Sequence, residues 1–134
     1  MSQWTSVELE MNDGECIVAA LKEMGFLPEV HDTAQSIEGY GGFRSRDQLK
    51  TANIIVRKKQ IEGISWADLG FRKNDNGAYT MVSDLKHSGQ KLTGQLKQLY
   101  GKHRVVKQVR RLGYSVTSQK VDKEGRIKIR VAAP

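Results

Sequence analysis

Residues 64–82 read ISWADLGFRKNDNGAYTMV, and this stretch predicts two strands joined by a tight turn. Residues 64–71 and 78–82 are rich in the β-branched and aromatic side chains that strands favour. Between them, residues 73–77 supply Lys, Asn, Asp, Asn and Gly, which is the turn chemistry of a hairpin. We therefore expect an antiparallel hairpin in the middle of the chain.

Apolar periodicity predicts one helix before this hairpin and one after it. Residues 15–24 form an amphipathic pattern, and a longer one runs from about residue 91 to residue 112. The longer helix carries one apolar stripe, made of Leu92, Leu96, Leu99, His103 and Val106. Both patterns end in glycine and an aromatic residue, Gly25-Phe26 and Gly113-Tyr114, which is typical of a helix end leading into a strand.

Further strands are predicted at residues 4–11, 26–30 and 52–56, and a last pair runs from Tyr114 to residue 131, turning at 122–125. Pro28 places the second of these strands at a sheet edge, because proline cannot donate to a ladder. Residues 33–50 are the least regular stretch, and residues 39–46 within it read as a loop. The lone Cys16 is expected to be a small core residue.

These elements indicate one α+β domain spanning residues 1–134. We expect an antiparallel sheet with two helices on one face. A ferredoxin-like split β-α-β arrangement with extra hairpin strands fits the order of elements best.

Several segments resemble an uncharacterised family of cyanobacteria, plastid genomes and some other bacteria, a conserved hypothetical reading frame or domain of unknown function. The resemblance covers nearly the whole chain. It rests on the aromatic Trp4 in the first strand, the Gly25-Phe26 join, and the segments EGYGG at 38–42, LGFRKNDNGAY at 69–79 and QLYGKH at 98–103. It implies a fold and no established activity.

Charge is unevenly distributed along the chain. Residues 91–134 hold twelve of the 22 Lys and Arg against only Asp122 and Glu124, whereas residues 1–90 hold ten bases against thirteen acids. With a net charge of +7 and a pI near 9.6, nucleic acid is the first partner to expect, and an acidic protein the next.

Two sets of cations are candidates for an anion-binding or nucleic-acid-binding site. Lys97, Arg104, Lys107 and Arg111 fall within an arc of about 80° on the second helix. Arg126, Lys128 and Arg130 alternate with apolar residues and share one face of the last strand. Trp66, Phe71 and Tyr79 could stack on unpaired bases, although core positions are favoured for Trp66 and Phe71.

We therefore expect a small, basic, non-catalytic module that binds RNA or single-stranded nucleic acid. The alternative is a protein-interaction adaptor or a subunit of a larger assembly, without nucleic-acid contact, that pairs through an edge strand such as 26–30 or 126–131. The sequence carries no indication of oligomeric state.

Enzyme chemistry is disfavoured, and no cofactor or metal site is predicted. His31, His87 and His103 occur singly, with no metal-ligand spacing. His103 can be read as a core or boundary residue or as one that faces a partner. An active site would need Tyr40, His103 and an acid such as Asp68 or Asp84 to converge.

A reducing compartment is expected from the single cysteine. No apolar run is long enough to span a membrane, and residues 1–10 lack the features of a signal peptide. The expected location is the cytoplasm, or the plastid stroma for an organellar member.

Overall fold

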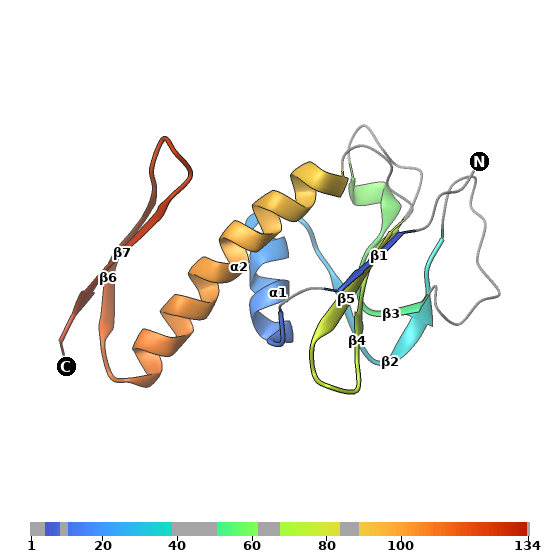
Figure 1. Ribbon diagram of the computed structural model, residues 1–134, viewed down its shortest axis with the longest axis horizontal. Coiled ribbons are helices and arrows are strands. Elements are labelled where there is room, and N and C mark those ends of the chain that lie inside the picture. Colours follow the sequence, from blue (N-terminus) through green and yellow to red (C-terminus); the bar gives the residue numbers. More distant parts are fainter. Residues whose placement is uncertain (1–4, 9–10, 39–50, 62–67, 84–88, 134) are drawn as a thin grey trace.

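The computed structural model describes residues 5–8, 11–38, 51–61, 68–83 and 89–133 (Figure 1). In chain order the elements are β1 (Thr5–Glu8), α1 (Gly14–Glu23), β2 (Glu29–Ser36), β3 (Thr51–Val56), the short 3-10 helix η3 (Lys58–Gln60), β4 (Leu69–Lys73), β5 (Tyr79–Ser83), α2 (Gly89–Arg111), β6 (Ser115–Val121) and β7 (Ile127–Ala132).

The main sheet has five strands in the order β1-β5-β4-β3-β2, and every neighbouring pair is antiparallel. The predicted central hairpin is confirmed: β4 and β5 pair from Leu69↔Ser83 to Lys73↔Tyr79. Its turn places Gly77 at a φ of 88°, a conformation that glycine adopts without strain. Residues 64–67 of the predicted strand lie outside the described residues.

The second strand differs from the expectation. β2 begins at Glu29 and continues to Ser36, so the prediction of an irregular segment is wrong for residues 33–36, while residues 39–50 lie outside the described part. β2 is an edge strand, as Pro28 suggested, and most of its side chains are exposed. An exposed edge strand does not need the alternating apolar pattern by which strands are recognised.

Both helices cover one face of the main sheet, which confirms the α+β prediction (Figure 1). The core joins that face to buried side chains of both helices: Cys16, Ile17, Ala20, Leu21, Ile54, Val56, Leu69, Phe71, Met81, Leu96 and Tyr100. The prediction of Cys16 as a core residue is confirmed, since it is 3% exposed.

The opposite face of the sheet is also buried in its centre. Ile37, Ala52, Ile55 and Val82 form a second apolar cluster there. Gly70 lets this cluster close, because a Cβ at that position would stand 2.6 Å from the Cβ of Ala52. Buried apolar side chains therefore cover the middle of the sheet on both faces.

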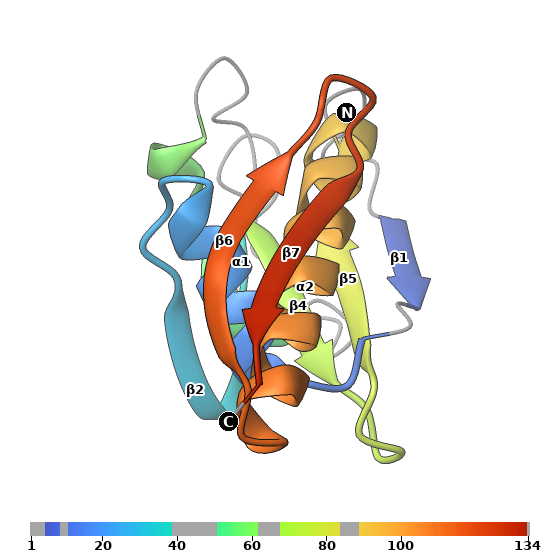
Figure 2. The ribbon, with the colours of Figure 1, turned by 90° about the vertical axis from the view of Figure 1, so that its left-hand side faces the viewer.

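The last two strands form a separate sheet. Among the described strands, β6 and β7 pair only with each other. They lie across α2 on the side away from the main sheet, so the described elements form three layers (Figures 1 and 2). β1 and β2 run parallel at opposite edges with three antiparallel strands between them, as a widened split β-α-β unit. The strand after α2 does not return to this sheet, so the ferredoxin-like arrangement is not confirmed.

Candidate nucleic-acid interface

The outer face of the β6–β7 hairpin carries the last strand's cations. Lys128 and Arg130 are exposed, whereas the alternating Ile127 and Ile129 are half-buried, and α2 packs against both strands. Lys120 lies directly opposite Lys128 in the ladder, so it shares the outer face. We call Lys120, Lys128 and Arg130 the cationic hairpin face, which lies on the opposite side of the β6–β7 sheet from the half-buried Ile127 and Ile129. Figure 2 shows this sheet in front of α2.

These three side chains have no acidic partner among the residues that the structure describes. Arg126 differs, although the sequence grouped it with them. Its guanidinium lies 2.8 Å from Asp122 and 3.4 Å from Glu124, across the turn that joins β6 to β7. Asp122 also accepts the backbone N–H groups of Glu124 and Arg126. Arg126 is therefore part of the turn.

The cations predicted on the second helix divide into two kinds. Lys97 and Arg111 are exposed. Arg104 and Lys107 instead contact Asp13, at 3.2 and 2.7 Å, and Lys107 also lies 3.2 Å from Glu15. Those two cations join α2 to the first turn of α1, so they are less available to a ligand than the sequence indicated.

Asp13 is held ionised by these contacts. Burial alone would raise the pKa of its carboxyl, but hydrogen bonds from Lys107 and from the Cys16 amide lower it below the ordinary value. The same carboxylate caps α1, because its Oδ1 accepts the Cys16 N–H at 3.1 Å. The Tyr100 hydroxyl of α2 accepts the N–H groups of Asn12 and Asp13, each at 3.2 Å.

His103 belongs to the same helix–helix contact. Its Nε2 lies 3.1 Å from a Glu23 carboxylate oxygen, and Lys102 pairs with that carboxylate too. Of the two roles that the sequence left open for His103, the geometry shows a boundary residue that ties α2 to the end of α1.

Neither of the two described aromatics of the predicted platform is open to solvent. Phe71 is fully buried and Tyr79 is 8% exposed, both on the face that the helices cover, so neither can stack on a base from solvent. The core reading of Phe71 is thus confirmed. Trp66, Tyr40, His87 and Asp84 lie outside the described residues.

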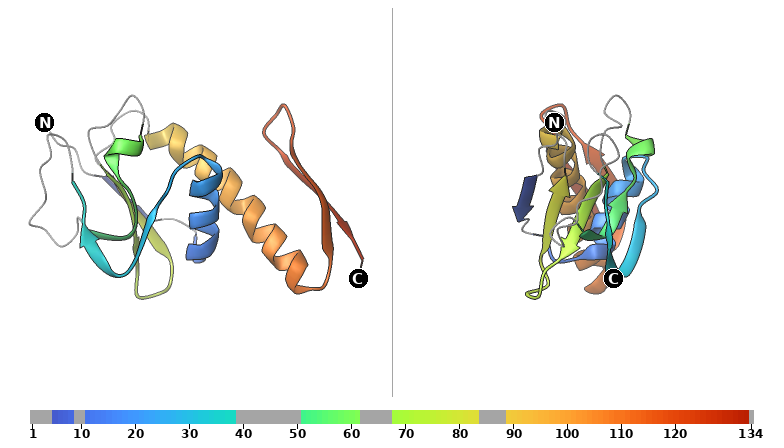
Figure 3. Two further views of the ribbon diagram at one scale, coloured as in Figure 1. Left: turned by 180° about the vertical axis from the view of Figure 1, so that it is seen from behind. Right: turned by 90° about the vertical axis from the view of Figure 1, so that its right-hand side faces the viewer.

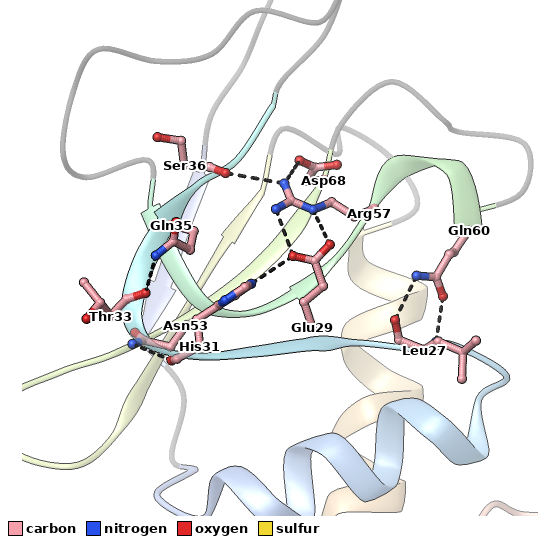
Figure 4. A network of polar contacts seen from close by, with 10 residues as sticks. All are labelled: Leu27, Glu29, His31, Thr33, Gln35, Ser36, Asn53, Arg57, Gln60 and Asp68. Carbon is pink, nitrogen blue, oxygen red and sulfur yellow. Dashed lines mark hydrogen bonds and ion pairs between the residues drawn. The ribbon is translucent and has the colours of Figure 1, made fainter.

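A polar network that the sequence did not predict lies at the β2 edge (Figure 4). Arg57 donates two hydrogen bonds to the Glu29 carboxylate, at 2.8 and 3.0 Å, and one to Asp68 at 3.0 Å. The Asp68 side chain is 2% exposed and also accepts the backbone N–H groups of Glu38 and Lys58, each at 2.8 Å. His31 Nε2 lies 2.9 Å from Glu29.

This network fixes the strand ends around it. Arg57 follows the last residue of β3, Glu29 begins β2, and Asp68 precedes β4, so one guanidinium holds three strands together. A signal was present in the sequence: an aspartate immediately before the apolar strand of the central hairpin, and an arginine ending a β-branched run. Nothing in the spacing indicated that these two side chains would meet.

The Arg57–Glu29 pair in this network makes the stability of the fold depend on pH in the acid range. Hydrogen bonds from Arg57, then from His31, lower the pKa of Glu29 from 4.5 to about 2. A carboxyl with a lowered folded-state pKa stabilises the fold above its unfolded pKa, and that contribution is lost as the pH falls. We expect the melting temperature to fall between pH 4.5 and about 2.

Glu29→Gln is the matched control for this prediction, because it keeps the shape of the side chain and removes its titration. The variant should be less stable than the parent at neutral pH, and the difference should shrink toward pH 2. Parallel pH profiles for the two proteins, measured by thermal unfolding, would assign the acid sensitivity to other groups.

No group of three or more His, Cys, Asp or Glu side chains in the described residues is placed to hold a metal ion. None of the helices in that part of the chain is both long enough and apolar enough to cross a membrane.

A family model matches residues 20–130, from the second half of α1 to within β7. The chain belongs to the DUF1257 family, described as a protein of unknown function. This confirms the resemblance to an uncharacterised family over nearly the whole chain. No curated protein and no solved structure matches it. The range that matches DUF1257 contains all three residues of the cationic hairpin face.

Proposed function

We propose that this protein is a small non-catalytic binding module for RNA or single-stranded nucleic acid. The observation that carries the proposal is the cationic hairpin face: Lys120, Lys128 and Arg130 are exposed together and lack acidic partners in the described part of the chain. Lys and Arg that are not neutralised by the protein itself are available to replace the counterions of a phosphate backbone.

The charge around this face supports a polyanionic partner. Residues 110–132 hold seven Lys and Arg against Asp122 and Glu124. Arg110 and Arg111 are exposed at the end of α2, from which the chain enters β6. The field of this end of the molecule attracts polyanions and repels cations. Lys97 is a further exposed cation on α2, whereas Arg104 and Lys107 would contribute less because they already contact Asp13.

A single strand fits this surface better than a duplex groove does. The hairpin is a short, narrow two-stranded sheet, and alternate residues along a strand stand about 6.6 Å apart. The flexible sugar–phosphate backbone of a single strand can place its phosphates against cations at such spacing, because it is not held in the fixed geometry of a duplex. In the described part of the chain, no exposed aromatic lies on the cationic hairpin face to read a base, so binding with little sequence preference is expected.

The competing proposal is a protein-interaction adaptor. Two observations favour it: among the described strands, β6 and β7 each have one edge without a neighbouring strand, and the apolar side chains of Val121 and Val131 are 50% and 43% exposed. An isolated two-stranded sheet is marginally stable, and a partner strand could extend it. Such a complex would bury apolar surface and would resist salt, unlike a complex held by phosphate contacts.

Salt dependence separates the two proposals. Fluorescence anisotropy with a short labelled single-stranded RNA should show submicromolar binding at moderate salt. The log–log plot of affinity against salt concentration should have a slope near −4, as expected for about five neutralised phosphates. Absence of binding, or a slope near zero, would contradict the nucleic-acid proposal and direct attention to the hairpin edges as a protein-binding surface.

A further inference from the structure

A groove of about 730 Å³ lies between α1 and strands β2 and β3, and none of its lining residues belongs to β6 or β7. Its apolar wall is formed by Val18 of α1, Val30 of β2 and Ile54 of β3. This volume falls within the range of small-molecule sites in proteins, which combine an apolar lining with a few polar groups. The polar groups of this groove decide what it can bind.

Tyr79 is the most informative of these groups. The residue lines the groove and is 92% buried, yet its hydroxyl has no hydrogen-bond partner among the described residues. Buried hydroxyls are normally hydrogen-bonded, so an unpartnered one beside a groove marks a position for a ligand atom. Burial, and then the charge of Asp13, raises the pKa of Tyr79, so the hydroxyl stays protonated and needs an acceptor.

The first turn of α1 adds donors beside this hydroxyl. Asp13 caps the Cys16 N–H, but the N–H groups of Gly14 and Glu15 have no partner in the described part of the chain. Gly14 also makes room for Tyr79, since a Cβ there would stand 2.5 Å from the hydroxyl oxygen. Three uncharged donors, the Tyr79 hydroxyl and these two N–H groups, thus belong to residues that line the groove.

The charges that line the groove nearly balance. Asp13, Glu15 and Asp32 face it together with Lys73 and Lys107, and Arg104 further neutralises Asp13. An anion would therefore gain little attraction while losing its hydration next to Asp13. A cation could donate to the Tyr79 oxygen, but it would leave the hydroxyl proton and the first-turn N–H groups without an acceptor, and it would meet the positive end of the α1 dipole. An uncharged acceptor matches the donors without either cost.

We propose that this groove binds a small uncharged molecule that combines an apolar body with a carbonyl or amide oxygen. The oxygen accepts hydrogen bonds from the Tyr79 hydroxyl and the first turn of α1, and the body lies along Val18, Val30 and Ile54. This site is independent of nucleic-acid binding and stands or falls separately from it.

Three probes of similar size and different charge test the site: benzamide, benzoate and benzylamine. Each is titrated into ¹⁵N-labelled protein while amide shifts are followed by NMR. Benzamide should bind tightest of the three and should move the resonances of Gly14, Val18 and Ile54 most. Tighter binding of benzoate or benzylamine, or shifts confined to other parts of the chain, would overturn the proposal.

Tyr79→Phe removes the hydroxyl alone and should weaken benzamide binding about fivefold, as the loss of one hydrogen bond predicts. The melting temperature of this variant should match that of the parent, because the hydroxyl has no hydrogen-bond partner among the described residues. Tyr114→Phe, at a 38% exposed tyrosine after α2, is the matched control and should bind normally. Equal affinity of Tyr79→Phe and the parent would show that the hydroxyl does not hold the ligand.

Discussion

Asp68→Ala should destabilise the protein by about 3 kcal/mol, because it removes one of the two carboxylate partners of a partly buried guanidinium together with the acceptor of two backbone N–H groups. The Asp68 side chain is 2% exposed and accepts from Arg57 and from the backbone N–H groups of Glu38 and Lys58. Alanine would leave all three donors without this acceptor in a site with little room for water. Urea unfolding followed by circular dichroism measures the loss.

Two further variants separate the charge of Asp68 from its hydrogen bonds. Asp68→Asn keeps the shape and part of the acceptor capacity, so it should cost less than alanine. In an Arg57→Ala background, Asp68→Ala should cost less than in the parent, because the two residues act together. A loss below about 1 kcal/mol for Asp68→Ala alone would mean that the network is not a structural centre of the fold.

Phe71→Ala should cost about 3–5 kcal/mol, the range for removing a large side chain from a well-packed core. Phe71 is fully buried on β4, the central strand of the main sheet, and pairs with Ile54 on one side and Met81 on the other. It lies on the face that both helices cover, so the cavity would loosen the sheet and the helices at once.

Phe71→Leu is the control for this prediction, since it keeps an apolar side chain of moderate size and should cost clearly less. Both variants are compared by urea unfolding with the slope of the transition monitored. Similar losses for leucine and alanine would indicate that the aromatic shape, and not the filled volume, holds this part of the core.

Local patterns were sufficient to predict the helices and the central hairpin. The observed helices begin and end within two residues of the predicted limits, because their apolar periodicity and glycine stops act over short distances. The hairpin was equally well specified, since residues 73–77 supply its turn. The length of β2 could not be predicted from apolar alternation, because an exposed edge strand has little of it.

The separate β6–β7 sheet could not be predicted in this way. α2 has 23 residues and so measures about 35 Å, whereas the 10 residues of α1 span about 15 Å. The C-terminal end of α2 therefore projects beyond the main sheet, and β6 and β7 lie on the side of α2 away from that sheet (Figure 3). Val105 in α2 and Leu112 just after it are 48% and 61% exposed. Alternation indicates which residues share a face of β7 but not which sheet β7 joins.

Only the part of the candidate site that depends on a local pattern could be predicted from the sequence. The exposed row of Lys128 and Arg130 followed from alternation along a single strand. The pairing of Arg104 and Lys107 with Asp13 joins residues more than 90 positions apart, and no local pattern records it. Lys120 was missed because its place on the same face depends on the β6–β7 register.

The most direct test of the proposed function compares two triple variants of equal charge by RNA anisotropy. One replaces Lys120, Lys128 and Arg130 with alanine, and the other replaces the exposed Lys22, Lys59 and Lys73, which lie on other elements. The hairpin variant should lose about a hundredfold in affinity at about 0.1 M salt, with a slope flatter by about two, while the control changes little. Equal losses in the two variants would contradict a binding surface on the hairpin, because generic charge would then explain the affinity.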